Sequence, residues 1–159
     1  DDRTGIHVPE ELKAKVRAAR NFRAATACRR QLAFAETDMQ LHEKEVPDPN
    51  AVKNRVFAHF GLEILPDDLF LNAFSHIFAG GYSAGYYGYK WSEVMSADCY
   101  GAFEEVGIAN DAAIQAVGRA YRETILALGG SESAFDVFVR FRKRKPSSAA
   151  LLRQQGLVR

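Results

Sequence analysis

The sequence predicts an all-α protein, and two observations carry this prediction. Apolar residues recur at intervals of three and four along most of the 159 residues, which is the spacing that places side chains on one face of an α-helix. Alternation typical of a β-strand never runs longer than a few residues, and the sequence has no internal repeat. With 47% apolar residues, the chain is long enough to form one helical domain with a hydrophobic core.

The first helical pattern lies within residues 1–45, where one apolar face runs from Leu12 to His42. Pro47 and Pro49 end this pattern, because two closely spaced prolines stop a helix and favour an extended linker. The sequence therefore predicts helices over residues 1–45, up to this pair of prolines.

A linker is expected over residues 46–75, with one short helix over residues 51–60 that Gly61 closes. A segment rich in glycine and tyrosine follows over residues 76–89. Helical spacing then returns, and residues 90–159 are expected to form helices to the end of the chain.

Four helical patterns can be distinguished in this last region. The first ends near Gly107 and carries an apolar stripe that is expected to be buried: Trp91, Val94, Met95, Ala102 and Phe103. Asn110 or Asp111 caps the second, which two glycines at residues 129–130 terminate. Ser131 is expected to cap the third, and Gly156 closes the fourth.

Composition excludes several classes of protein. A net charge of +1 argues against a dedicated binder of nucleic acid or of membrane surfaces. No stretch approaches the ~20 consecutive apolar residues that a membrane-spanning helix needs. Two cysteines do not make a disulfide framework, so an intracellular, reducing compartment is expected. The first residues resemble neither a signal peptide nor a transit peptide.

The charge is unevenly distributed along the chain. Residues 1–30 carry a net charge of +4, residues 31–118 carry −9, and residues 119–159 carry +6. Two explanations remain open at this point. The basic ends and the acidic middle can pair within one domain, or they can face a second polypeptide.

Patterns for metal binding are weak. A zinc peptidase typically has two histidines four residues apart on a helix, with a glutamate next to the first. The only His-Glu pair is His42-Glu43, and Val46 stands where the second histidine would be. A complete zinc site is therefore not expected from the four histidines of this chain, His7, His42, His59 and His76.

Two further patterns are better explained by structure than by chemistry. Cys28 and Cys99 fall on apolar helix faces and are expected to be buried, inert thiols. The basic run at residues 140–145 suggests nucleic-acid contact or a packed helix end. Phe141 within the run continues an apolar face, which favours a packed helix whose cations lie near the last carbonyl groups.

The segment from His76 to Tyr89 is the unusual part of the sequence, with one histidine, four tyrosines and four glycines. Each glycine costs up to ~1 kcal/mol in a helix, so glycine indicates a backbone that bends past or touches something. Tyrosine hydroxyls and an imidazole can donate hydrogen bonds to a developing oxyanion. From these residues alone the segment is either a loop that covers a substrate or a tyrosine-rich packing surface.

This segment resembles the thimet oligopeptidase family of zinc metallopeptidases, most closely its oligopeptidase A and dipeptidyl carboxypeptidase branch. The matching string is His76-Ile-Phe-Ala-Gly-Gly-Tyr-Ser-Ala-Gly-Tyr-Tyr-Gly-Tyr-Lys-Trp91, followed by Ser-Glu-Val-Met-Ser-Ala-Asp98. Further similarity extends upstream to Ala19-Arg-Asn-Phe22 and downstream to Ala150-Leu-Leu. The resemblance covers nearly all 159 residues.

The resemblance implies that residues 1–159 are the C-terminal part of a larger, two-lobed helical peptidase that cleaves short peptides. Its zinc-binding His-Glu-x-x-His and a third ligand, a glutamate, belong to a region upstream of the one matched here. By position in the motif, Tyr89 resembles the tyrosine that stabilises the oxyanion. The residues on the substrate-binding side are His76, Tyr82, Tyr86, Gly80 and Gly81.

Two hypotheses about function follow. In the first, the chain is the substrate-binding part of a zinc-dependent oligopeptidase and is inactive without the upstream half. In the second, it is a non-catalytic helical module recruited into a larger assembly with another protein chain. For the first, the resemblance implies the cytosol, or the mitochondrion or plastid if a full-length precursor carries a transit peptide. No nucleic acid and no membrane span are expected.

Overall fold

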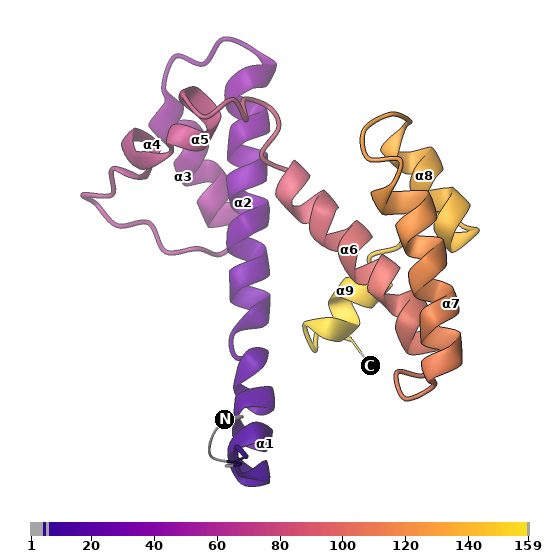
Figure 1. The fold of residues 1–159 in the computed structure, drawn as a ribbon. Helices are drawn as coiled ribbons and strands as arrows, with labels where there is room; N and C mark the ends of the chain where they lie inside the picture. Colours follow the sequence, from indigo (N-terminus) through magenta and orange to yellow (C-terminus); the bar gives the residue numbers. More distant parts are fainter. Residues whose placement is uncertain (1–4, 6, 159) are drawn as a thin grey trace.

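The computed structural model describes Gly5 and residues 7–158, and within these residues every regular element is a helix (Figure 1). The prediction of an all-α protein is confirmed. The elements in chain order are α1 (Glu10–Arg20), α2 (Ala24–Glu43), α3 (Pro49–His59), α4 (Phe70–Ala73), α5 (Ser75–Phe78), α6 (Gly88–Glu105), α7 (Asp111–Tyr121), the π-helical turn η1 (Arg122–Leu126), α8 (Ala134–Arg142) and α9 (Ala149–Gln154).

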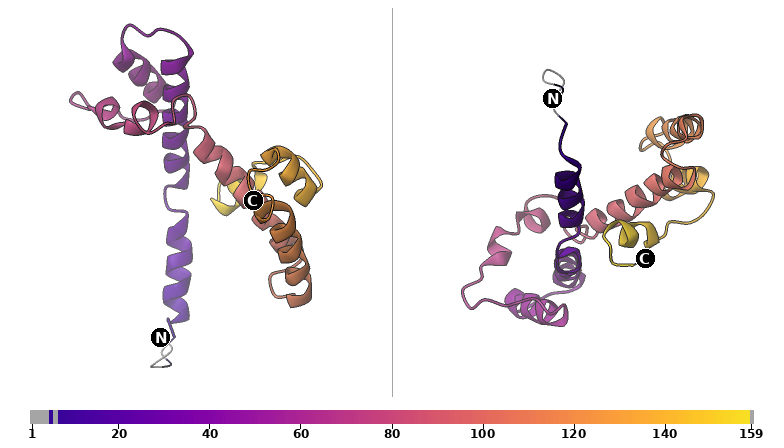
Figure 2. Two further views of the ribbon diagram at one scale, coloured as in Figure 1. Left: turned by 45° about the horizontal axis from the view of Figure 1, so that its top comes forward. Right: turned by 90° about the horizontal axis from the view of Figure 1, so that it is seen from below.

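The helices form two groups. In Figure 1, α3, α4 and α5 lie beside the upper part of α2, whereas α6 leads away from α2 towards α7, α8 and α9, and the views of Figure 2 show the same two groups. None of the described helices is long and apolar enough to cross a membrane. The segment between α5 and α6 joins the two groups, and this segment is the one rich in glycine and tyrosine.

The helical region before the prolines consists of two helices, α1 and α2. A turn at residues 21–23 separates α1 from α2, which lie roughly end to end (Figure 1). Arg23 has φ 56°, a left-handed conformation that interrupts α-helical hydrogen bonding. The turn also brings Asn21 against the end of the chain, since a Cβ atom at Gly156 would lie 2.9 Å from the Asn21 amide nitrogen.

Pro49 begins a helix and does not form part of an extended linker. Pro49 is the first residue of α3, where a fixed φ and a missing N–H are tolerated. Asp48 caps this helix, because its carboxylate accepts a hydrogen bond from the Ala51 N–H at 3.0 Å. The extended backbone predicted for this region is therefore shorter than expected. Gly61 follows α3 with φ +61°, as expected of a residue that ends a helix.

The larger hydrophobic core lies between α2, α3, α4 and α5. Phe34 of α2 is at its centre, with ring centroids 4.5 Å from Phe70, 5.5 Å from Phe74 and 6.1 Å from Phe57. Tyr86, which follows α5, packs against the same ring at 6.0 Å. The first group of helices is thus held together by aromatic side chains from segments up to about fifty residues apart.

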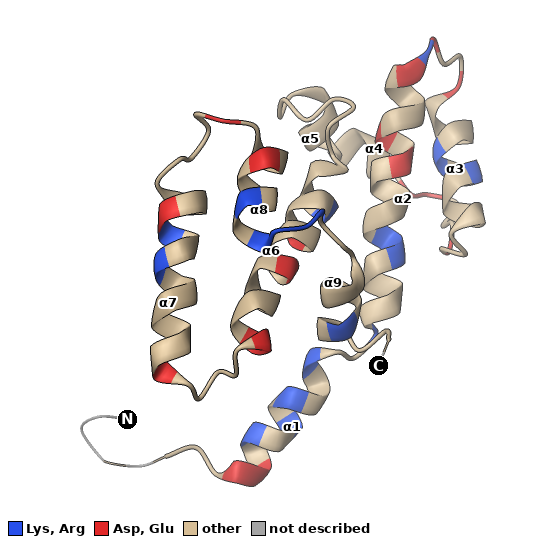
Figure 3. Ribbon diagram, turned by 90° about the vertical axis from the view of Figure 1, so that its right-hand side faces the viewer, with Lys and Arg blue, Asp and Glu red and all other residues tan. Residues whose placement is uncertain are grey.

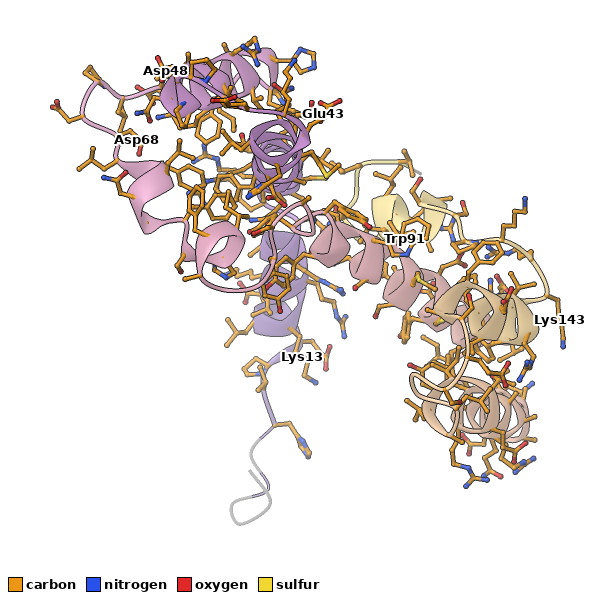
Figure 4. All side chains as sticks on the ribbon, turned by 90° about the horizontal axis from the view of Figure 1, so that it is seen from above. Lys13, Glu43, Asp48, Asp68, Trp91 and Lys143 are labelled. Atoms are coloured by element: carbon orange, nitrogen blue, oxygen red, sulfur yellow. The ribbon has the colours of Figure 1, made fainter. Side chains whose placement is uncertain are left out.

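The expected buried stripe on α6 is wrong in part. Trp91 is 48% exposed, and Val94, Met95, Ala102 and Phe103 are only partly buried. The buried residues of α6 are instead Ala97, Asp98, Cys99 and Gly101. Figure 4 shows Trp91 on the part of α6 that leads away from α2. Burial is concentrated further along α6, where α8 and α9 pack against it.

Ion pairs account for the basic run at residues 140–145. Arg140 pairs with Glu132, Arg142 pairs with Glu105 and Asp98, and Arg144 also pairs with Asp98. Figure 3 shows these basic residues at α8 and the stretch of chain that follows it. The arginines of the run are thus held mainly by carboxylates of this chain, whereas the sequence favours cations near the last carbonyl groups of the helix, and much of the local charge is balanced within the chain.

The predictions of helix caps and of thiol burial are confirmed only in part. The Asn110 side chain accepts a hydrogen bond from Ala113 N–H at 3.3 Å, which confirms the cap of α7. Ser131 is not the cap of α8, because its hydroxyl donates to the Leu128 carbonyl at 2.6 Å and α8 begins after Ser133. Cys99 is buried as expected, and burial raises the pKa of its thiol to about 11, whereas Cys28 is only partly buried.

Candidate functional site

The structure brings the four aromatic residues of the predicted site into one cluster. His76 lies on α5, Tyr82 and Tyr86 on the connecting segment, and Tyr89 at the start of α6. The His76 ring centroid lies 6.2 Å from Tyr82, 5.9 Å from Tyr86 and 6.3 Å from Tyr89. Tyr82 and Tyr89 stack at 5.2 Å, and Tyr86 meets Tyr89 edge-on at 5.0 Å. We call residues 82–89 the tyrosine segment.

A tight turn after α5 sets the position of His76 relative to this segment. Gly80 N–H donates to the Ser75 carbonyl at 2.7 Å, and Tyr82 N–H donates to the His76 carbonyl at 3.0 Å. A Cβ atom at Gly80 would lie 2.8 Å from the His76 Cα, so a larger residue does not fit. Gly81 has φ +80°, which favours glycine. Both predicted glycines thus have a local structural role in this turn.

The tyrosine segment itself consists of successive tight turns. The Ser83 hydroxyl donates to the Ile77 carbonyl at 2.6 Å. Gly85 N–H donates to the Tyr82 carbonyl at 2.8 Å, and Gly88 N–H donates to the Gly85 carbonyl at 3.0 Å. Ala84 has φ 51°, a left-handed conformation that costs a residue with a side chain roughly 1–2 kcal/mol. Other contacts must therefore hold this backbone in place.

The buried Asp38 of α2 supplies such contacts. Its side chain is 0% exposed, and its two carboxylate oxygens accept hydrogen bonds at 2.9 Å from Ala84 N–H and from Tyr86 N–H. His42, one turn further along α2, has Nδ1 2.9 Å from the Asp38 carboxylate and 2.8 Å from the Asp38 carbonyl oxygen. The sequence alone does not point to this role of Asp38, because the spacing of apolar residues in α2 does not show that Asp38 contacts Ala84, a residue 46 positions later in the sequence.

The tyrosines of the cluster differ in exposure and in hydrogen bonding. Tyr86 is 9% exposed, and its hydroxyl donates to Gln31 Oε1 at 3.1 Å. Burial raises the pKa of Tyr86. Tyr89 is 40% exposed, and hydrogen bonding with Tyr82 is the main cause that raises the pKa of Tyr89. A tyrosine hydroxyl is protonated at neutral pH even at its ordinary pKa of about 10, so the Tyr89 hydroxyl can donate a hydrogen bond.

A cavity of about 780 Å³ lies against this cluster. Its lining comes from the junction of α1 and α2, from α5 and the start of α6, and from α9. The cluster contributes His76, Tyr86 and Tyr89 to the wall. The other polar and charged lining residues are Arg20, Asn21, Arg30, Gln31, Lys90, Glu93, Gln154 and Gln155. Sequence patterns assign no binding role to these residues, since they lie on separate helices.

The arrangement offers hydrogen-bond donors beside an open, mixed polar and apolar wall. Tyr89 and His76 present a hydroxyl and an imidazole at the cavity, and Arg20 and Arg30 add cationic groups. Lys90 is paired with Glu93 at 2.6 Å. Such a wall can hold a polar, extended ligand and can stabilise negative charge that develops on it.

The described residues do not fit a zinc centre. Within Gly5 and residues 7–158, no group of three or more histidine, cysteine, aspartate or glutamate side chains lies close enough to hold a metal ion. His42 is engaged by Asp38, and His76 belongs to the aromatic cluster. We therefore assign no chemical step through zinc to any residue of this chain.

Comparison with known proteins gives consistent matches. Residues 1–157 match peptidase family M3. Over 98% of its length, the chain is 50% identical to the organellar oligopeptidase A, chloroplastic/mitochondrial, of Arabidopsis thaliana, and it covers 20% of that protein. It is 47% identical to the probable cytosolic oligopeptidase A of the same plant and 42% identical to oligopeptidase A of Escherichia coli, and it covers 23% of each. The chain thus spans about a fifth of the length of the curated relatives it matches.

Proposed function

Because this chain belongs to peptidase family M3, we propose that it is the part of an oligopeptidase that binds a short peptide and stabilises its reacting carbonyl group. The observation that carries the proposal is the aromatic cluster at the wall of the cavity. His76, Tyr82 and Tyr89 come together there, with two of them lining a space of about 780 Å³.

Each member of the cluster has a distinct proposed role. Tyr89 donates its hydroxyl hydrogen to the oxygen that becomes negatively charged when the peptide carbonyl is attacked. One such donor is typically worth about 2.7–4 kcal/mol of transition-state stabilisation. His76, Tyr82 and Tyr86 bind the peptide, and the Tyr86 hydroxyl is itself held by a hydrogen bond to Gln31. Gly80 and Gly81 shape the turn that presents His76.

Peptide cleavage also needs groups that this chain is proposed to obtain from elsewhere. The family resemblance implies zinc as the cofactor, and the described residues do not fit it. The chain spans about a fifth of the length of its curated relatives, so the remaining polypeptide is proposed to supply the zinc-binding residues. We accordingly expect the chain alone to be inactive.

Exposed apolar residues support a partner polypeptide. Leu12 and Val16 on α1 are 50% and 63% exposed, and Phe22 in the turn after α1 is 79% exposed. We propose that the upstream part of the peptidase covers this face. The relatives carry the names cytosolic and chloroplastic/mitochondrial, which supports an intracellular location in one of these compartments.

The proposal is tested by reconstituting activity. The chain is mixed with the remaining polypeptide of an oligopeptidase A that lacks this region, and cleavage of a short fluorogenic peptide is measured with zinc. We expect cleavage by the mixture and by neither part alone. Tyr89→Phe in the mixture is expected to lower kcat about 100–1,000-fold, because the oxyanion loses a donor.

Tyr87→Phe is the matched control, since Tyr87 lies in the same segment, is 54% exposed and is outside the cluster. It is expected to change kcat less than about threefold. Stable association of the two parts without any cleavage would contradict the proposal and would favour the alternative, a non-catalytic helical module that binds another protein chain. Equal effects of Tyr89→Phe and Tyr87→Phe on kcat would show that the Tyr89 hydroxyl does not take part in the reaction.

A further inference from the structure

We propose that Asp38 is a positioning residue that holds the tyrosine segment in the arrangement needed for binding and reaction. This inference rests on the proposed function of Tyr89 and extends it to a residue of α2 that lies outside the cavity lining. Asp38 binds the segment at two points, Ala84 N–H and Tyr86 N–H, each at 2.9 Å.

The carboxylate is suited to this task because it presents two acceptors to two backbone donors. One oxygen receives Ala84 N–H and the other receives Tyr86 N–H. An asparagine in the same place has one carbonyl oxygen and one NH₂ group. Its oxygen can accept a hydrogen bond from one of the two backbone N–H groups, but its NH₂ group would then face the other N–H, and neither can accept. A buried N–H without an acceptor is unfavourable, so the segment is expected to shift away.

A short chain of contacts connects Asp38 to Tyr89. Tyr86, held through its backbone, places its ring 5.0 Å from Tyr89 and 5.9 Å from His76. The Tyr86 carbonyl accepts the Tyr89 N–H at 3.2 Å, which sets the first turn of α6. Through these contacts, Asp38 fixes where the Tyr89 hydroxyl lies relative to the oxyanion that it is proposed to bind.

Ala84 supplies independent support. Its φ of 51° is unfavourable for alanine, and the Asp38 carboxylate binds the N–H of this same residue. The neighbouring His42 approaches the carboxylate at 2.9 Å and adds a third partner. A fully buried carboxylate with these partners holds a local conformation that the segment does not favour on its own.

The first experiment measures hydrogen exchange of individual amides in the chain. In Asp38→Asn, the amides of Ala84 and Tyr86 are expected to exchange at least 10-fold faster than in the unaltered chain, while amides within α3 keep their rates. Asp48→Asn is the matched control, because this exposed carboxylate also binds a backbone N–H, that of Ala51. It is expected to leave Ala84 and Tyr86 unchanged. Unchanged exchange at both amides in Asp38→Asn would overturn the inference.

Kinetics of the reconstituted peptidase then separate the inference from the proposed function. Asp38→Asn is expected to lower kcat about 10–100-fold, because Tyr89 is displaced from the reacting oxygen, with a smaller rise in KM, because Tyr82 of the same segment is proposed to bind the peptide. If Tyr89→Phe lowers kcat and Asp38→Asn does not, the positioning role is wrong and the proposed function stands. If neither substitution lowers kcat, the proposed function itself fails.

A second measurement covers the case in which Asp38→Asn does not fold. In the unaltered chain, the Ala84 and Tyr86 amides are expected to exchange as slowly as the Leu62 amide, whose backbone hydrogen bond to Phe57 is 2.8 Å long. Rapid exchange at both positions would show that Asp38 does not hold the segment and would overturn the inference without any variant.

Discussion

At Gly80 the backbone leaves no room for a side chain, and this gives a prediction at the scale of one residue. The Cβ of Gly80→Ala would lie 2.8 Å from the Cα and 2.9 Å from the carbonyl oxygen of His76. Both are backbone atoms that cannot rotate away. We expect the substitution to destabilise the fold by about 1–3 kcal/mol, measured by urea unfolding, and to displace His76.

Gly88→Ala is the control for this prediction. Gly88 begins α6, and among the described atoms none lies within 4 Å of the place that a Cβ atom would take there. Removing a glycine from such a position typically stabilises a protein by about 0.4–1 kcal/mol, through the unfolded chain. An unchanged free energy of unfolding in Gly80→Ala would mean that the turn at Gly80 has room for a side chain after all, and equal destabilisation by both substitutions would mean that the loss does not come from the contact with His76.

The residues of the site divide into those that the sequence can reveal and those that it cannot. His76, Tyr82, Tyr86 and Tyr89 could be singled out from the sequence because they lie within 14 residues, so local turns already bring them near one another. Asp38 meets the segment from 46 residues away, and its surroundings in sequence are those of an ordinary amphipathic helix. Only the packing of α5 and the segment against α2 reveals this contact.

At the scale of helices, local chemistry is predictable from the sequence and tertiary contacts are not. Asn110 caps α7 and Gly61 ends α3, because caps and left-handed glycines depend on neighbouring residues. The break at Arg23 follows no glycine or proline and so has no clear local signal in the sequence. The exposure of Trp91 differs from the prediction because periodicity shows which side of a helix is apolar but not what covers it.

The junction of α6, α8 and α9 depends on one carboxylate, which predicts a response to pH. Asp98 is 0% exposed and accepts hydrogen bonds from Arg144 and from Ser147 N–H, with Arg142 also paired to it. Burial alone would raise the pKa of Asp98, but Arg144, the Ser147 amide and Arg142 together hold this pKa below its ordinary value. The ionised form is therefore favoured by folding.

The sign of the effect follows from this lowered pKa. The stabilisation is complete above the pKa of an unfolded aspartate, about 3.9, and is lost as pH falls through the lower pKa of the folded state. We expect the melting temperature to drop below about pH 4 and to change less steeply with pH in Asp98→Asn. This variant should itself lose about 1–3 kcal/mol at pH 7, because Arg142, Arg144 and the Ser147 amide lose a charged acceptor, although Arg142 keeps Glu105.

A matched variant separates this effect from general acid denaturation. Glu132→Gln removes a carboxylate that pairs with Arg140 on α8 and is exposed, with 40% of its side chain accessible. Exposed pairs contribute about 0–1 kcal/mol, so this variant should keep the acid sensitivity of the unaltered chain. An identical pH profile for the unaltered chain and Asp98→Asn would rule out Asp98 as the source of the response.

At the scale of the whole molecule, the fold consists of two packed groups of helices with the tyrosine segment between them (Figures 1 and 2). The core of the first group lies around Phe34, and the second group buries Val137 and Phe138 of α8 and Ala150 of α9. The cavity is bounded by helices of both groups, so the position of α9 relative to α2 shapes it. Binding of a peptide there would connect the two groups.

Helix α1 lies exposed on the molecule, because none of its residues is buried within the described part of the chain. It has acidic residues at its start and basic residues along its length, visible in Figure 3, and an apolar face with Leu12 and Val16. In a stable protein such a face normally meets another surface. The proposed partner is the remaining part of the oligopeptidase.

Val16→Glu tests this arrangement, with Val56→Ala as the matched comparison. Val16 is 63% exposed, so its substitution is expected to change the free energy of unfolding of the isolated chain by less than about 0.5 kcal/mol. Val56 is 2% exposed, and its truncation removes two buried carbon groups at about 0.8 kcal/mol each, so a loss of about 1.5 kcal/mol or more is expected.

Association with the remaining polypeptide, measured by titration calorimetry, should weaken at least 10-fold in Val16→Glu, because a carboxylate would be buried there without a partner. A large loss of stability in the isolated Val16→Glu chain would place the partner of α1 within the chain itself, and unchanged association would leave this face outside the contact.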